Sequence, residues 1–353
     1  MKKTMKCLVA VFVMALAFVM TGTTAKAEET KRLNDDLVLD LNVTSEISNV
    51  GEGTYTGGGV TGLQQTAATL NSITISWTPA AGVASYEICS CDPTTGMLTK
   101  IDQVAANVNT YTFSNLPNDY GALIVVYGVD AQGEKGLAKG QYGLVAVYTQ
   151  PTKIPKVDYY NQAFAGKNKL TVGWSASPIA EGYDVVLYDR KGKVKQKATL
   201  GWKQNDVYGV YSTKFSKSNT QNIYKVVITP YITIKNGTEK VNGAKSTFYA
   251  VPQARRTSKD SDIGINSFNL KWKKVNGATK YEVYVSTKKT SGFKKVATVN
   301  KNKTSYKITK YKGKTINTLN KKYYIKLVTV AKFGKKTVKS KTNIVTSIYS
   351  YYK

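Results

Sequence analysis

Apolar and polar residues alternate along three stretches of the chain, at residues 73–77, 170–174 and 268–272. Side chains two apart on a strand lie on the same face, so each stretch is predicted to be a strand with one buried face. Each stretch ends at a tryptophan, and a tyrosine follows nine residues later. A long-range repeat of this kind predicts like modules in tandem. We expect the repeated rings to form the structural core of the modules: Trp77, Tyr86, Trp174, Tyr183, Trp272 and Tyr281.

A third element follows each of these pairs. It is an apolar stretch that begins at a tyrosine and ends at a turn glycine; the residues are Tyr120 and Gly133, Tyr224 and Gly237, and Tyr323 and Gly334. No stretch of comparable length has the 3.6-residue period of a helix. Many short strands separated by turn residues predict an all-β chain built of antiparallel sandwiches.

These features together resemble fibronectin type III modules. The resemblance is carried by the tryptophan of the second strand, the Tyr-acid-aliphatic start of the third, and the run from Tyr111 to Leu116. It covers about residues 60–353; the second module has an insertion at 201–211, and the third lacks the Leu-Pro corner. The resemblance implies a secreted bacterial protein with three tandem immunoglobulin-like sandwiches, each of two sheets. It also implies adhesion, spacing or display, without catalysis.

The segments outside and between these repeats predict the boundaries of the domains. A basic start, an apolar run and Ala25-Lys26-Ala27 predict a signal peptide at 1–27, removed on export. Polar residues that end in three glycines predict a flexible spacer at 28–59. The modules are expected at 60–150, 151–252 and 253–353, the last of them rich in lysine. No further long apolar segment follows, so no transmembrane segment is expected in the mature chain.

Several kinds of chemistry are disfavoured by composition. The chain has no histidine, which excludes histidine-based triads and most catalytic zinc sites. We expect no enzyme activity, no cofactor and no metal. Glu87, Asp102 and Asp130 belong to a group of carboxylates that we place on strand exteriors and turns; the others are Asp92, Asp119 and Glu134.

Two cysteines, Cys89 and Cys91, remain after export. They lie two apart on a predicted strand, on the face opposite Tyr86 and Ile88. Exposed thiols, a labile bridge and an intermolecular contact stay open as alternatives, beside the simpler interpretation that these are unimportant small residues.

Charge is distributed unevenly along the chain. Residues 28–150 have 5 basic and 13 acidic residues, a net charge of −8, whereas residues 151–260 have a net charge of +12. Residues 261–353 have 23 lysines against Asp262 and Glu282, a net charge of +21. Such a field attracts polyanions. The candidate polyanion-binding residues are Lys271, Lys273, Lys274, Lys288, Lys289, Lys294, Lys295, Lys321, Lys322, Lys335 and Lys336.

The expected partners are anionic cell-wall polymers or acidic glycans, and also other surface proteins. Arginine is scarce, so specific recognition of nucleic acid is not expected. We therefore predict a non-catalytic, surface-associated binding or spacer protein, secreted and held at the cell wall. A coding bias towards lysine, which would serve only solubility, is the simpler alternative.

Exposed tyrosines give a second functional alternative. Aromatic rings stack on sugar faces, so this chain could instead bind carbohydrate, or serve as an accessory subunit of a system that degrades cell walls or polysaccharides. The tyrosines not expected in the core are Tyr159, Tyr160, Tyr208, Tyr211, Tyr349, Tyr351 and Tyr352.

Overall fold

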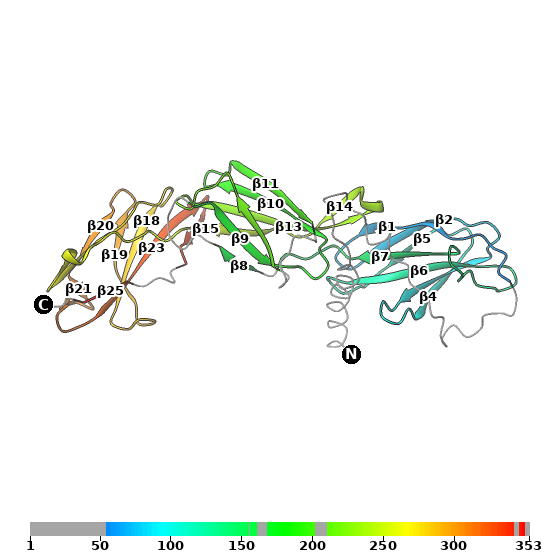
Figure 1. Cartoon of the computed structure of the whole chain (residues 1–353), viewed down its shortest axis with the longest axis horizontal. Coiled ribbons are helices and arrows are strands. Elements are labelled where there is room, and N and C mark those ends of the chain that lie inside the picture. The colour runs from blue at the N-terminus through cyan, green and yellow to red at the C-terminus, as the bar shows by residue number, and fades with distance from the viewer. Residues whose placement is uncertain (1–53, 155, 161–167, 202–209, 342–345, 350–353) are drawn as a thin grey trace, which may run out of the picture. The chain divides into compact units, whose positions relative to one another are not determined.

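The computed structural model describes residues 54–154, 156–160, 168–201, 210–341 and 346–349, except for the side chains of residues 159 and 160. Within these residues the long elements are all β-strands, and the pairing of the strands is antiparallel (Figure 1). The all-β prediction is confirmed. The predicted signal peptide and most of the predicted spacer lie outside the described residues, and within the described part no helix is long and apolar enough to cross a membrane.

The first two sheets enclose a core of their own. The smaller sheet has the order β1-β2-β5 and the larger β4-β3-β6-β7. The strands are β1 (Thr61–Ala68), β2 (Ile73–Thr78), β3 (Ser85–Cys91), β4 (Leu98–Ala105), β5 (Thr110–Phe113), β6 (Gly121–Val129) and β7 (Tyr142–Tyr148). Ile75 and Trp77 from the smaller sheet pack against Tyr86, Ile88 and Val126 from the larger. Alternation along each strand thus places the aromatic rings between the sheets.

The next two sheets repeat this arrangement. The smaller has the order β12-β9-β8; the larger has the order β11-β10-β13-β14, and β15 also pairs with β13. The strands are β8 (Val157–Tyr160), β9 (Leu170–Ser175), β10 (Gly182–Asp189), β11 (Val194–Gly201), β12 (Val210–Phe215), β13 (Tyr224–Ile234), β14 (Glu239–Asn242) and β15 (Ser246–Ala250). Trp174 and Tyr183 are fully buried here.

The last sheets follow the same plan with a small hairpin added. The smaller sheet is β16-β17-β20, the larger is β19-β18-β23-β24 with β25 also on β23, and β21 pairs with β22. The strands are β16 (Ile263–Gly264), β17 (Ser267–Lys271), β18 (Lys280–Ser286), β19 (Lys294–Asn300), β20 (Ser305–Ile308), β21 (Lys310–Tyr311), β22 (Lys314–Thr315), β23 (Tyr323–Phe333), β24 (Lys336–Lys339) and β25 (Thr346–Ile348). Trp272 and Tyr281 lie in one core with Phe268, Val283 and Ile325.

The chain forms two compact units, and their boundaries differ from the boundaries between the pairs of sheets. One compact unit contains the first two sheets together with residues 177–183 and 229–244, and the second contains the remaining strands. Residues 229–244 include the end of β13, the turn Lys235–Gly237 and β14. The proposed module boundaries at 150/151 and 252/253 therefore stay a prediction.

Residues 54–59, which the sequence analysis assigned to the spacer, pack against the first sheets. The Tyr55 ring covers Gly128 and Gly136, where a Cβ atom would come within 3.0 Å of the ring or its oxygen. Thr56 donates two hydrogen bonds of 3.0 Å to Asp130, from its backbone nitrogen and its hydroxyl. Gly58 donates a third to the Ala81 carbonyl. This part of the chain is held by specific contacts.

Candidate functional site

The register of the last large sheet brings two lysine-rich segments to one end. In this sheet β18 and β23 run antiparallel, and Ser286 at the end of β18 pairs with Tyr324 at the start of β23. The same end of β18 adjoins the start of β19, because Val285 pairs with Lys294. The β18–β19 turn and the residues just before β23 therefore lie at the same end of the sheet. Each contributes adjacent lysines: Lys288, Lys289, Lys294, Lys295, Lys321 and Lys322.

The β21–β22 hairpin adds lysines at this end. The Tyr311 hydroxyl donates to the Gly292 carbonyl over 3.3 Å, and the Tyr311 ring lies edge-on to Tyr323 with the centroids 6.1 Å apart. Gly313 has a φ of +78°, a conformation that favours glycine at the turn of the hairpin. The hairpin carries Lys310, Lys312 and Lys314, which the sequence analysis did not select. We call these nine side chains the lysine cluster: Lys288, Lys289, Lys294, Lys295, Lys310, Lys312, Lys314, Lys321 and Lys322.

The turn beneath the lysine cluster is held by hydrogen bonds. The Ser286 hydroxyl donates to the Ser291 carbonyl over 2.6 Å and accepts from the Lys288 backbone nitrogen over 2.9 Å. Gly292 has a φ of +68°, which an L side chain adopts only with strain. The backbone of the turn is thus ordered, while the lysine side chains point outward and are exposed. Such an arrangement presents charge from a stable support.

The described carboxylates make no ion pair with the lysine cluster, although the charge of Glu282 acts on Lys295. The last acidic residue in the sequence is Glu282, on β18. In the described part of the chain Glu282 contacts Lys280 and Lys339, and Asp262 contacts Lys271. None of the nine cluster lysines has an ion pair with a described residue. Apart from the interaction of Lys295 with Glu282, their shared field is screened by solvent ions and extends about 8 Å at physiological salt.

The remaining predicted lysines lie elsewhere, so the eleven candidates do not form one surface. Lys271 on β17 makes an ion pair of 2.6 Å with Asp262. Lys273, Lys274, Lys335 and Lys336, here called the opposite-end lysines, lie near the start of β18 and the end of β23. The Lys336 ammonium lies 4.7 Å from the Tyr249 ring centroid, and the Lys274 carbonyl accepts from Gln221 over 3.4 Å. The spacing of lysines in the sequence could not distinguish the lysine cluster from the opposite-end lysines, because their positions on the sheet depend on which strands pair.

The tyrosines proposed for carbohydrate binding have mixed outcomes. Tyr211 is buried and stacks on Trp174 with the centroids 6.3 Å apart, so its predicted exposure is wrong. Register explains the error, because Tyr211 pairs with Trp174 across β12 and β9. Tyr349 is half-buried. The side chains of Tyr159 and Tyr160, and residues Tyr208, Tyr351 and Tyr352, lie outside the described residues.

The cysteine thiols are buried and unpaired, which rules out the predicted alternatives of exposed thiols and a labile bridge. Burial raises the pKa of Cys89 and of Cys91 to about 11. Because the thiolate is the reactive form, neither cysteine is suited to nucleophilic chemistry. In the part of the chain that the structure describes, no group of three or more His, Cys, Asp or Glu residues could hold a metal ion.

Glu87, which was placed on a strand exterior, is instead buried, and Asp130 lies in a turn as expected but is also buried. Burial alone would raise the pKa of Glu87, but contacts with Lys100, Tyr127 and Lys135 outweigh it and lower that pKa. The Tyr127 hydroxyl and the Lys100 ammonium donate to the two oxygens of Glu87. Asp130 accepts hydrogen bonds from backbone nitrogens around it, including Gln132 and Glu134. Both carboxylates are committed to internal contacts rather than open to a substrate.

No protein-family model matches this chain, and no curated protein matches it. Among solved structures, the FN1–FN3 domains of chicken CNTN1 are 15% identical over 83% of this chain and 99% of that one, with a TM-score of 0.24. A segment of two fibronectin type III domains from chicken tenascin is 16% identical over 54% of this chain and 97% of that one, with a TM-score of 0.27. We draw no argument from scores this low, and the architecture rests on the sheets and registers described above.

Proposed function

We propose that this chain is an exported, non-catalytic protein of the cell surface, which attaches to anionic wall polymers or acidic glycans through the lysine cluster. The sheets that precede the lysine cluster in the sequence then serve as a spacer or as a display platform. The observation that carries the proposal is the gathering of nine exposed lysines at one end of a sheet, none of which makes an ion pair with a described carboxylate. The coding-bias alternative predicts no function for that gathering.

The use of lysine rather than arginine favours binding of polyanions over binding of ligands that are recognised by their geometry. A lysine ammonium is a compact charge on a flexible stem, so it pairs with phosphate, sulfate or carboxylate groups without reading their arrangement. Attachment by many such contacts is strong at low salt and weakens as ions screen the field. We expect no preference for a particular nucleotide sequence, because the bidentate arginine contacts that read bases are missing from this cluster.

The test compares two variants with the same change in net charge. In one, Lys288, Lys289, Lys294 and Lys295 become Gln; in the other, the opposite-end lysines Lys273, Lys274, Lys335 and Lys336 become Gln. The probe is a column of immobilised heparin, run with rising NaCl. We expect the first variant to elute at roughly half the salt concentration needed for the unmodified chain, and the second to shift much less.

Thermal melting of both variants provides the control for folding. Equal shifts for the two variants would show that only total charge matters, and would contradict a defined site. A chain that fails to bind the column at about 50 mM NaCl would remove the proposal altogether. Attachment in cells is tested by washing intact producing cells with salt and following the release of the chain. Retention at about 1 M NaCl would exclude electrostatic attachment.

A further inference from the structure

Acidic charge in this chain is concentrated in residues 28–53, which we call the acidic segment. It contains seven acidic and two basic residues, a net charge of −5. The carboxylates are spread from one end of the segment to the other: Glu28, Glu29, Asp35, Asp36, Asp40, Glu46 and Glu52. The structure of this segment lies outside the described residues, but its charge is opposite in sign to that of the lysine cluster.

Carboxylates on the described strands and turns are held largely by contacts of their own. Asp119 accepts a hydrogen bond from the Thr152 hydroxyl over 2.6 Å, and Asp184 accepts one from the Thr199 hydroxyl over 2.7 Å. Ion pairs likewise commit the two acidic residues within residues 261–353. An acidic partner for the lysine cluster from within this chain is therefore expected to be the acidic segment.

The acidic segment is long enough to cover the lysine cluster. An extended chain spans about 3.4 Å per residue, so residues 28–53 can reach roughly 85 Å. The four-stranded path of the sheet that supports the cluster is about 15 Å across, because paired strands lie about 4.8 Å apart. Several carboxylates can thus pair with several lysines at once. Just after the acidic segment the chain is held to the first sheets, because Thr56 donates to Asp130 at 3.0 Å.

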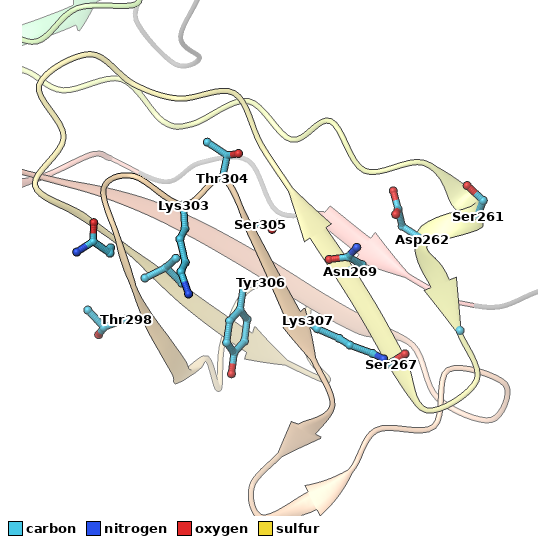
Figure 2. A pocket seen from close by; sticks show the side chains of 13 residues that line it. Ser261, Asp262, Ser267, Asn269, Thr298, Lys303, Thr304, Ser305, Tyr306 and Lys307 are labelled. Carbon is cyan, nitrogen blue, oxygen red and sulfur yellow. The ribbon is translucent and has the colours of Figure 1, made fainter.

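Lys303 and Lys307 do not offer an equivalent surface. Figure 2 shows these two lysines on different sides of β20, so their ammonium groups do not converge. The pocket that they help to line also contains the carboxylate of Asp262, so its charge is mixed. The lysine cluster makes no ion pair with a described carboxylate, and it is therefore the better partner for the acidic segment.

We infer that the acidic segment binds the lysine cluster, and that an anionic polymer has to displace the segment before it can attach. The inference rests on the proposed function and adds a regulation of the same site. The carboxylates of the segment pair with the ammonium groups that the polymer needs, so the two compete. Occupied clusters lower the apparent affinity for the polymer in proportion to their population. The acidic segment would thus make attachment selective for polymers of high charge density.

The first experiment uses the full chain on the heparin column with rising NaCl. Four carboxylates of the acidic segment are replaced, as Asp35→Asn, Asp36→Asn, Asp40→Asn and Glu46→Gln. The replacement is made in the unmodified chain, in the variant with four lysine-cluster changes and in the variant with four opposite-end changes; the last two have the same net charge. We expect the eluting salt concentration to rise about 1.5-fold in the unmodified chain and in the opposite-end variant. In the lysine-cluster variant the rise should be at most about a third as large, because the segment has lost four of its partners.

The second experiment tests direct contact. A fluorescein-labelled peptide of residues 28–53 is titrated with the full chain that has the four carboxylates replaced, at about 50 mM NaCl, and its anisotropy is followed. We expect saturable binding. The four lysine-cluster changes should weaken it about tenfold, and the four opposite-end changes less than twofold.

Two results would overturn the inference. One is an equal rise in eluting salt for the lysine-cluster and opposite-end variants, which would reveal an effect of total charge alone. The other is the absence of saturable binding by the peptide. Failure of the proposed function is recognised separately, because the lysine-cluster variant would then keep its retention on heparin. If that retention is lost while replacement of the carboxylates changes nothing, the proposed function stands and the inference fails.

Discussion

The tyrosine that follows each tryptophan strand uses its hydroxyl in the same way. Tyr86 accepts a hydrogen bond from the Ala80 nitrogen over 2.6 Å, Tyr183 from the Ser177 nitrogen over 2.6 Å, and Tyr281 from the Val275 nitrogen over 2.9 Å. Each donor lies six residues before its tyrosine, in the connection that follows the tryptophan strand. The ring packs in the core while its oxygen satisfies a backbone group. This dual role gives a physical reason for the fixed spacing of tryptophan and tyrosine.

Removal of this hydroxyl should destabilise the chain. In Tyr281→Phe the ring still fills the core, but the buried Val275 nitrogen loses its acceptor, which costs roughly 1–3 kcal/mol. Tyr306→Phe is the matched control, because the Tyr306 hydroxyl has no partner among the described residues. Urea unfolding followed by tryptophan fluorescence gives both free energies of unfolding. Equal stabilities for the two variants would contradict the role assigned to the Tyr281 oxygen.

At the level of elements, strands β3 and β18 each contain a buried glutamate that contacts a lysine and a tyrosine. Glu87 and Glu282 each follow the core tyrosine, and each lies just before a shift in register with the neighbouring strand. Glu87 binds lysines at 2.8 and 3.3 Å, and Glu282 binds Lys339 at 2.8 Å and accepts from the Tyr284 hydroxyl at 2.8 Å. Glu87 therefore joins β3 to the adjacent β4 through Lys100, and Glu282 joins β18 through Lys339 to β24, the strand beyond β23.

This arrangement predicts how stability depends on pH. Burial would raise the pKa of Glu282, but Lys339 and Tyr284 outweigh burial and lower it below the ordinary value of 4.5. The unfolded chain then binds the proton more readily than the folded chain, so the stabilisation is present above pH 4.5 and is lost as the pH falls through the folded pKa. We expect Glu282→Gln to be less stable at neutral pH and to show a shallower loss of stability in acid. Urea midpoints measured from pH 7 to about pH 3 test this, and parallel pH curves for the two proteins would refute it.

At the level of the whole molecule, the compact units do not coincide with the sheet pairs. The outer face of the sheet β4-β3-β6-β7 is apolar, and Leu123, Tyr127 and Tyr148 on it belong to one buried cluster with Ile232 and Ile234 from β13. A central strand that is buried on both faces reads as a continuous apolar run, as β6 does. The first sheet pair is therefore stabilised by residues that are far away in the sequence.

Coupling between these segments can be measured at β6. We expect Ile232→Ala to leave a cavity that costs about 2–5 kcal/mol, and to lower the protection of the amides of residues 121–129 against hydrogen exchange. Val172→Ala on β9 is the matched control, since Val172 is equally buried but does not belong to this cluster. If neither variant changes exchange in β6, the first sheet pair folds independently of the second.

The predictions from the sequence are correct for properties that depend on neighbouring residues in one strand. Alternation with a period of two reports which side chains share a face of a strand, so it identified the all-β class and the inward positions of Trp77, Trp174 and Trp272. It also placed Cys89 and Cys91 on one face, opposite Tyr86. It could not say what lies over that face, because the covering residues Ile179, Ile232 and Ile234 come from distant parts of the chain.

The sequence by itself thus determined the strands, their buried faces and the amount of charge at the end of the chain. Only the tertiary structure decided that Lys288, Lys310 and Lys322 belong together while Lys273 and Lys336 do not. Strand pairing and the contact of Tyr311 with Gly292 set that grouping. Antiparallel pairing brings residues of unrelated position side by side, and a shift in register by one residue would turn each of them to the other face.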